Sequence, residues 1–332
     1  MAAVAFKDAD WQQKIRYMNE YDNFARLYGV RLVEYAPGFA RLQMQVDKMH
    51  LNSQGRIHGG WLSGLLIIAG SKAARSYGQE VQIASLTMNY CRNVSEGVIT
   101  VTATEKYRNA HTASYQAEMH TAEGRLLTAG VVSFELLKEE VSYHLLPPPT
   151  AEWYLVRESP IWPEERADLH TDIAGLRPCF SRADWPVRRQ YMNENENLFY
   201  AEGITVTDFG PGLCRAYMKL LPRHFDARGL LEPACIAMVL DPTMGKPSLS
   251  GGEFSVTAQM SIDFYGPSAA EELVAEGRER TRGEHFGVSG GEIWDESGRL
   301  LATGSCTMFL RHSEIDFRRE HPLNYPEGPE GA

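Results

Sequence analysis

Residues 50–70 read HLNSQGRIHGGWLSGLLIIAG, and this stretch decides the fold. Its second part is apolar on nearly every side of a helix that we expect over 59–76, with Gly64 and Gly70 inside it. A helix without a polar face is buried on most sides, and internal glycines let another backbone approach closely. The stretch therefore predicts a long central helix that other elements must enclose.

The segments on both sides of this helix have the patterning of short helices and strands. We expect a first helix at 10–27, a loop at 50–57, and strands at 29–36, 39–47, 81–91, 97–107, 112–122 and 125–137. Turns such as Pro37-Gly38 and Glu123-Gly124 join consecutive strands as hairpins. One long buried helix wrapped by an antiparallel sheet is an α+β architecture.

The chain repeats itself at a constant offset of 174 residues. Ala9-Asp10-Trp11 recurs as Ala183-Asp184-Trp185, and Gly124-Arg125-Leu126-Leu127 recurs as Gly298-Arg299-Leu300-Leu301. Across 129 aligned positions, 30 are identical without a gap. Chance identity would be roughly 6% for ordinary composition, so we infer a duplicated domain. The prediction is domains at 9–139 and 183–311, a proline-containing connector at 140–182 and a polar tail at 312–332.

Length and composition are those of a two-domain globular protein. The chain has 332 residues, 43% of them hydrophobic and 23% charged. No apolar run approaches the ~18 residues of a membrane span, and the N-terminus lacks the pattern of a secretory signal. The net charge of −10 argues against nucleic acid or an anionic membrane as the main partner. We therefore expect a cytoplasmic protein that binds neither.

Two familiar kinds of site are not supported by the sequence. The five cysteines are scattered and form no CxxC pair, so we expect reduced thiols and no metal site. Gly287 to Gly291 fit the G-x-S-x-G pattern of a serine hydrolase. A nucleophile elbow needs a strand before it and a helix after it, whereas strands are expected on both sides here.

The start of the central helix has the composition of an oxyanion site. His58, Gly59 and Gly60 lie where the helix begins, and Asn52 and Gly55 suit a braced, tightly bent loop. A helix start offers unpaired N–H groups and the positive end of the helix dipole. Such groups can stabilise the oxyanion that forms on an attacked carbonyl. The alternative is that His58 only caps the helix.

The pattern H-L-N-x-x-G-x-x-H-G-G at 50–60, followed by an apolar helix, resembles the hotdog-fold acyl-CoA thioesterases of the PaaI type. The resemblance implies a tandem pair of hotdog domains that form an intrachain pseudo-dimer. It also implies hydrolysis of acyl-CoA at a site between the two units, with no cofactor beyond the coenzyme A of the substrate. In that family an acidic residue nine positions after the histidine, on the same helix, directs or supplies the nucleophile.

The mismatches between the repeats predict which site is active. Nine residues of helix span ~13.5 Å, so the start of one helix must work with the acid of the other, antiparallel unit. The first repeat has Ile67 at the acid position, whereas the second has Asp241. The second repeat has instead lost the loop, with Glu232 for His58 and Pro233 for Gly59. Proline has no N–H to donate.

We therefore predict one composite site with Asn52, His58, Gly59 and Asp241 as catalytic residues, and an inert second pocket. Asp241 precedes Pro242, and the alternative is an Asp-Pro pair that only breaks the helix.

Five further residues are candidates for substrate binding. Gly60 could add a second N–H, and Gln259 and Thr243 could face the active pocket. Arg108 and Arg282 match each other in a late hairpin, near which the family places coenzyme A phosphates. The alternative for the arginines is a solvated hairpin end.

The predicted activity is therefore acyl-CoA thioester hydrolysis by a homo-oligomer of pseudo-dimeric chains. Two other functions stay open: a non-catalytic acyl-CoA-binding hotdog protein, and a hotdog hydratase or dehydratase that acts on acyl-CoA.

Overall fold

The computed structural model describes residues 5–52, 54–142, 180–194 and 196–315. Most of the connector expected at 140–182 and the end of the tail expected at 312–332 lie outside the described residues, at 143–179 and 316–332, as does Cys179. The other four cysteines are free thiols, with Cys91 exposed and the rest buried.

The first half contains one long helix and six strands. Its helical elements are η1 (Phe6–Asp8), α1 (Trp11–Glu20), α2 (Asn23–Leu27), η2 (Lys48–His50) and α3 (Gly59–Arg75). Its strands are β1 (Arg31–Ala36), β2 (Phe39–Gln45), β3 (Gln79–Tyr90), β4 (Val98–Arg108), β5 (Thr112–Thr121) and β6 (Leu126–Glu140).

The second half repeats this order of elements. Its helical elements are η4 (Phe180–Arg182), α6 (Trp185–Glu194), α7 (Asn197–Glu202), η5 (Pro222–His224), α8 (Pro233–Gly245) and η6 (Lys246–Gly251). Its strands are β7 (Ile204–Gly210), β8 (Leu213–Lys219), β9 (Glu253–Phe264), β10 (Glu272–Arg282), β11 (Phe286–Asp295) and β12 (Leu300–Glu314).

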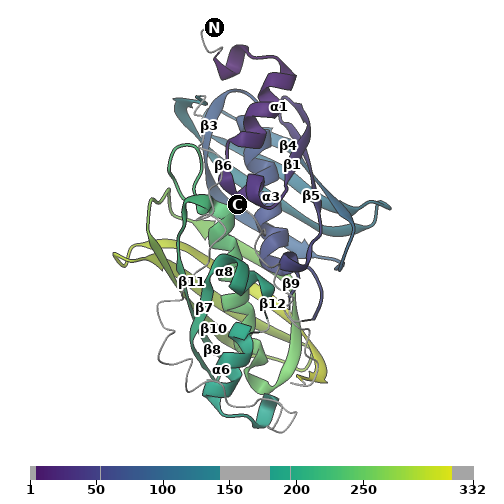
Figure 1. Cartoon of the computed structure of the whole chain (residues 1–332), viewed down its shortest axis with the longest axis vertical. Helices are drawn as coiled ribbons and strands as arrows, with labels where there is room; N and C mark the ends of the chain where they lie inside the picture. Colours follow the sequence, from purple (N-terminus) through teal and green to yellow (C-terminus); the bar gives the residue numbers. More distant parts are fainter. Residues whose placement is uncertain (1–4, 53, 143–179, 195, 316–332) are drawn as a thin grey trace, which may run out of the picture.

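All twelve strands form one antiparallel sheet. Its order is β1-β2-β4-β5-β6-β3-β9-β12-β11-β10-β8-β7, so the halves join where β3 pairs with β9. At that junction Thr87 lies opposite Ser261, its counterpart at the 174 offset, and their hydroxyl oxygens are 3.2 Å apart. The two halves are thus related by a local twofold arrangement. Helices α3 and α8 both run roughly along the long axis of the molecule, with α3 in the upper part and α8 in the lower part of Figure 1.

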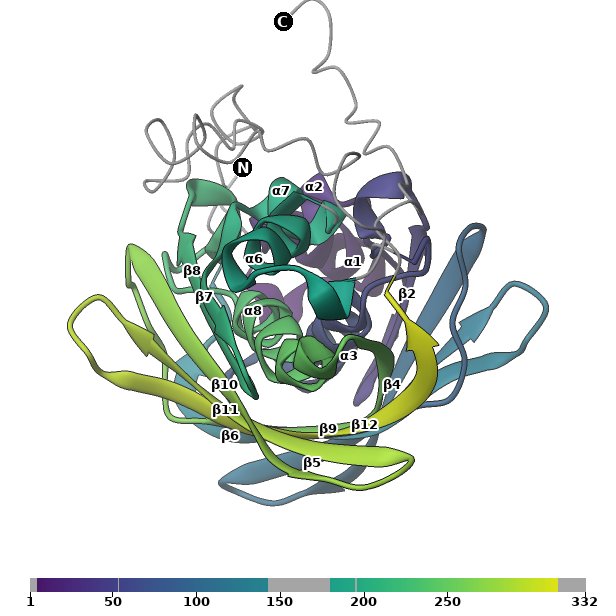
Figure 2. The same ribbon diagram turned by 90° about the horizontal axis from the view of Figure 1, so that it is seen from below.

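The helices lie in the concavity of the curved sheet, with α3 and α8 innermost (Figure 2). Every residue of α3 from Gly60 to Arg75 is buried, as its nearly continuous apolar composition predicts. Trp61, which is 0% exposed, packs against the aromatic rings of Phe24 and Tyr28 from α2 and its end. The antiparallel sheet around long buried helices agrees with the sequence prediction.

The expected single helix at 10–27 is wrong, because the chain breaks between α1 and α2 at Tyr21 and Asp22. The Asp22 carboxylate accepts the Ala25 N–H at 2.6 Å and so caps a new helix. It also pairs with the buried Lys72 of α3 at 2.6 Å. The side chain of Asp22 therefore competes with continued helix, which a periodicity of apolar residues does not reveal.

The boundary of the expected tail is also wrong at its start. Strand β12 continues to Glu314, and the Ile315 side chain is 0% exposed. The Ile315 N–H donates to the Gly252 carbonyl, which anchors this segment to the end of η6.

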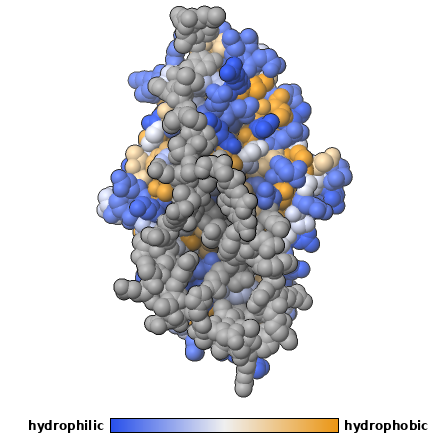
Figure 3. Space-filling model, in the orientation of Figure 1, coloured by the Kyte–Doolittle hydropathy of each residue, from blue (hydrophilic) through white to orange (hydrophobic). Residues whose placement is uncertain are grey.

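Where coloured residues are visible in Figure 3, hydrophilic residues surround several apolar patches. Among the described helices, none is both long enough and apolar enough to cross a membrane. The G-x-S-x-G segment lies inside β11, and Ser289 is fully buried there, so it is not a nucleophile elbow.

Candidate active site

The loop before α3 is braced by Asn52. The Asn52 Oδ1 accepts the N–H groups of Gln54 at 3.0 Å and Arg56 at 3.1 Å. Gly55 has a φ of +67°, a left-handed conformation that favours glycine. The loop thereby delivers His58 to the N-cap of α3 and leaves the Asn52 side chain on the wall of a cavity.

The first N–H groups of α3 differ in their partners. The Gly60 N–H donates to His58 Nδ1 at 3.0 Å, so this imidazole nitrogen is an acceptor. The Gly59 N–H has no hydrogen-bond partner in the part of the chain that the structure describes, and Gly59 lines the cavity. Burial lowers the pKa of His58, which keeps the ring neutral and suited to accept from Gly60.

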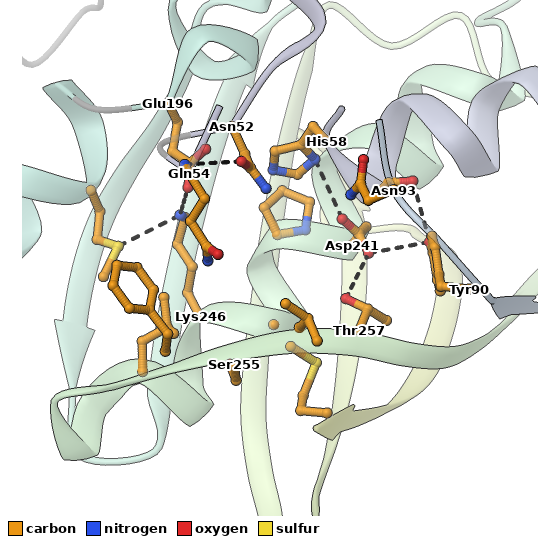
Figure 4. Close-up of a pocket in the computed structure, with 18 of the residues that line it drawn as sticks. Asn52, Gln54, His58, Tyr90, Asn93, Glu196, Asp241, Lys246, Ser255 and Thr257 are labelled. Atoms are coloured by element: carbon orange, nitrogen blue, oxygen red, sulfur yellow. Dashed lines mark hydrogen bonds and ion pairs between the residues drawn. The ribbon is translucent and has the colours of Figure 1, made fainter. Parts of the chain in front are cut away.

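Asp241 lies in the last turns of α8 and faces the start of α3 from the other half of the chain. Its Oδ2 is 3.5 Å from His58 Nδ1. A Cβ added to Gly59 would stand 2.8 Å from Oδ2, so only glycine fits beside the carboxyl group. The Tyr90 and Thr257 hydroxyls donate to Oδ1, each at 3.4 Å (Figure 4).

The electrostatic state of Asp241 follows from its burial. The side chain is 5% exposed, and burial raises its pKa above the ordinary value. The positive charge of a protonated His58 ring would oppose this rise, as do the two hydroxyl donors and the Gly60 N–H. The result is a carboxyl group that gives up its proton less readily than a solvated one and is a stronger base once ionised.

Close packing of α3 on α8 brings these groups together. Gly60 lies against Met238, whose Cα would be 3.0 Å from an added Cβ, and Gly64 lies against Ala234. These two contacts are related by the 174 offset, as expected for antiparallel helices about a local twofold. Pro242 lies inside α8 and lines the cavity, and α8 continues past it to Gly245.

The cavity beside Asp241 has a volume of about 280 Å³. Both halves of the chain line it, with Lys246 and Glu196 forming a buried ion pair of 3.0 Å on one wall. Figure 4 shows that pair on the opposite side of the cavity from Tyr90. Within the described ranges, no group of three or more His, Cys, Asp or Glu side chains is placed to hold a metal ion.

Three residues that were expected to bind substrate do not face the cavity. The Gly60 N–H is directed at His58 Nδ1 and at the Asp241 carboxyl group, and Gly60 does not line the cavity. The Thr243 hydroxyl donates to the Val239 carbonyl at 2.6 Å, within its own helix. The Gln259 side chain donates to Ser261 at 2.9 Å on the outer side of β9, away from the cavity.

The two arginines are also not brought to the cavity. Arg108 donates to Gln79 at 2.9 Å, and its guanidinium stacks over the ring of Tyr77. Arg282 donates to Glu279 at 2.8 Å and to the Ser248 carbonyl at 2.9 Å. Neither arginine lines the cavity, because each is held in its own hairpin region by local partners.

The structure places two hydroxyls on Asp241 that sequence reasoning missed. The offset could have found them, because the counterparts of Tyr90 and Thr257 are Phe264 and Ile83, which have no hydroxyl. Thr257 reaches the cavity because β9 has a bulge at Ala258, where the register with β12 shifts. The bulge reverses the alternation of side chains, so Thr257 points inward and Gln259 outward.

A second, smaller cavity occupies the position related to the first by the 174 offset. Ile67 stands there for Asp241, Glu232 for His58, and Pro233 for Gly59. Ile83 and Phe264 complete its apolar wall.

Family models agree with this architecture. The model of the thioesterase superfamily matches residues 54–128, and the model of the acyl-CoA thioesterase C-terminal domain matches residues 163–309. A protein of Archaeoglobus fulgidus named "Putative esterase" is 29% identical over 112 residues, which are 33% of this chain and 73% of the relative.

Two solved structures share the fold over most of the chain. The tesB protein of Mycobacterium avium subsp. paratuberculosis has a TM-score of 0.54 at 13% identity, covering 91% of this chain and 99% of its own. A protein with a hot dog fold from Alicyclobacillus acidocaldarius has a TM-score of 0.54 at 17% identity, covering 87% and 97%. The fold is therefore the hotdog fold, and each half of the chain contains a match to a thioesterase family model, which supports a thioester hydrolase.

Proposed function

We propose that this chain hydrolyses acyl-CoA thioesters at one composite site between two tandem hotdog domains, 9–139 and 183–311. The observation that carries the proposal is the Asp241 carboxyl group of the second half lying against His58 and Gly59 of the first. A base and an unpaired helix N–H on one cavity wall are what acyl transfer to water requires.

In the proposed reaction the thioester carbonyl oxygen accepts the Gly59 N–H at the start of α3. Ionised Asp241 removes a proton from a water molecule as the water oxygen bonds to the carbonyl carbon. The helix N–H stabilises the oxyanion of the tetrahedral intermediate. The carbon–sulfur bond then breaks, which yields a carboxylic acid and the coenzyme A thiol, with the proton held on Asp241 available to the thiolate.

The surrounding residues have positioning roles in this scheme. The hydroxyls of Tyr90 and Thr257 hold Oδ1, and both carboxyl oxygens lie beside Gly59. The Asn52 amide group and the His58 ring line the cavity and would orient water and the carbonyl. The scheme needs no cofactor, because water and the thioester supply every atom.

Basic residues at the cavity mouth support an anionic substrate such as acyl-CoA. Arg92 lines the cavity, and Arg311 approaches Gln54 on its rim at 3.5 Å. At the offset of 174, the corresponding positions are Gly266 and Leu137. The arginines that line the second cavity, Arg75 and Arg228, are instead paired with acids of the chain. Arginine suits the phosphates of a coenzyme A ester.

A panel of acyl-CoA thioesters with a thiol-detecting dye tests the proposal. Asp241→Asn should lower kcat by about 10²- to 10⁴-fold, the usual contribution of a general base, without loss of fold. The matched control is Asp263→Asn, which changes an exposed carboxylate on β9. Its turnover should stay within about twofold of the wild-type value.

Three other outcomes would contradict the proposal. Unchanged turnover in Asp241→Asn would reject Asp241 as the base. Addition of water without thiol release would indicate a hydratase, and binding without either reaction would indicate a non-catalytic acyl-CoA-binding protein.

A further inference from the structure

The second cavity contains a buried carboxyl group that has no partner. Glu232 is 5% exposed and lines this cavity at the start of α8. No hydrogen bond or ion pair joins its side chain to any other residue of the described ranges, and it does not cap its own helix. An unpaired carboxyl group in an apolar site is costly and calls for a ligand or a proton.

The cations near Glu232 are already neutralised by other acids. Lys72 pairs with Asp22 at 2.6 Å, and Arg75 pairs with Glu80 at 2.8 Å. Arg228 lies 2.7 Å from Asp226 and 3.4 Å from Glu80. Three cations thus balance three carboxylates, and Glu232 is the fourth acid of the group, with no counter-ion of its own.

Charged and apolar side chains both line the cavity around Glu232, and the charged ones include the paired Arg75 and Arg228. Asp22 and Asp226 both raise the pKa of Glu232, and with burial as the largest cause it reaches about 8. Pro233 offers no N–H at the helix start, unlike Gly59 in the first cavity. The far wall consists of Ile67, Ile83, Ile236 and Phe264.

We propose that the second cavity is a binding site for a small organic cation, a primary ammonium group on a short apolar chain. The ammonium group would pair with the Glu232 carboxylate, and the chain would pack against Ile67 and Phe264. The cavity volume of about 70 Å³ limits the ligand to a few heavy atoms. This inference does not rest on the proposed thioesterase function, since it concerns the other cavity.

The proposal has a distinct thermodynamic signature. A carboxyl group with a pKa of about 8 is mostly protonated at neutral pH, so binding of an ammonium group must release a proton. The affinity should rise about tenfold per pH unit below that pKa and level off above it. A neutral ligand bound by hydrogen bonding would show neither effect.

Calorimetric titration of the full chain with n-butylammonium chloride, in two buffers of different ionisation enthalpy, tests this. We expect binding with release of nearly one proton at pH 7, no binding of butyrate, and at least tenfold weaker binding of butyramide. Glu232→Gln should abolish both binding and proton release, whereas Asp241→Asn, in the other cavity, should retain them.

Three results would overturn the proposal. They are no binding of butylammonium to the wild-type chain, equal binding by Glu232→Gln, and butyramide binding as tightly as the amine. Because proton release is measured on the wild-type chain, the test does not depend on the variant folding, and loss of thioesterase activity in Asp241→Asn has no bearing on it.

Discussion

At the scale of single residues, Asp241 determines how the proposed reaction depends on pH. Burial raises its pKa above 3.8, and only the ionised form is a base. The rate should therefore fall as the pH is lowered through this raised pKa, by about tenfold per pH unit below it. The measurement is kcat/KM against pH, with circular dichroism to establish that the fold persists.

The residual rate of Asp241→Asn should lack this acid limb, which provides the control. A wild-type profile that stays flat down to about pH 4 would show that no group with a raised pKa acts as the base. The same shift has a consequence for stability. The folded chain holds the Asp241 proton more tightly than the unfolded chain. The folded state therefore becomes less stable as the pH rises from the ordinary pKa of the carboxyl group through the raised one.

Site residues were predictable from the sequence where a comparison of the two repeats was enough to identify them. They were not predictable where the geometry of the backbone decides which way a side chain points. The offset pairs Asp241 with Ile67 and His58 with Glu232, and both contrasts proved to belong to two matching cavities. Gln259 was expected to face the active pocket, and the alternation of side chains along β9 decides whether it does. The bulge at Ala258 reversed this alternation, and no residue type in that strand announces a bulge.

At the scale of elements, the crossing of α3 and α8 sets the distance between base and helix start. A methyl group on Gly60 would come within 3.0 Å of the Met238 backbone, which cannot yield without moving a helix. On Gly64 its nearest neighbour would be the Ala234 side chain at 3.3 Å, with the Ala234 backbone farther away at 3.7 Å. We expect Gly60→Ala to lose about 1–3 kcal/mol of unfolding free energy, the usual cost of overpacking.

Gly64→Ala is the matched control for this crossing, because it adds the same methyl group to the same helix. Its gain in helix propensity of about 1 kcal/mol should offset the milder contact. Chemical denaturation measures both variants. Equal stability of the two variants would mean that α3 and α8 can move apart at Gly60 without cost. The distance between these helices would then not be what positions Asp241.

Elements were more predictable than sites because hydrophobic periodicity reports burial directly. The central helix expected at 59–76 runs from Gly59 to Arg75, and the strand expected at 97–107 runs from Val98 to Arg108. The break at Asp22 escaped the pattern because one polar side chain, capping a new helix and pairing with Lys72, outweighed the apolar spacing around it.

At the scale of the whole molecule, duplication explains why the chain has two cavities and proposed catalytic groups in only one. Each cavity combines the helix start of one half with a helix residue of the other half. The first cavity has Gly59 and Asp241, and the second has Pro233 and Ile67. The acid is missing from the first repeat at Ile67, and the helix N–H is missing from the second at Pro233. Both changes therefore fall in the second cavity, which would lack both proposed catalytic groups. Both losses leave the first cavity intact, so the second became free to change.

This asymmetry predicts how many molecules of an acyl-CoA analogue one chain binds. The second cavity has about 70 Å³ against about 280 Å³, and Pro233 offers no N–H at its helix start. Calorimetric titration of the wild-type chain with a non-hydrolysable thioether analogue should give a stoichiometry near one per chain. Two equivalent sites would contradict the single composite site, because they would require the smaller cavity to accept the same ligand without a helix N–H at Pro233 and without an acid at position 67.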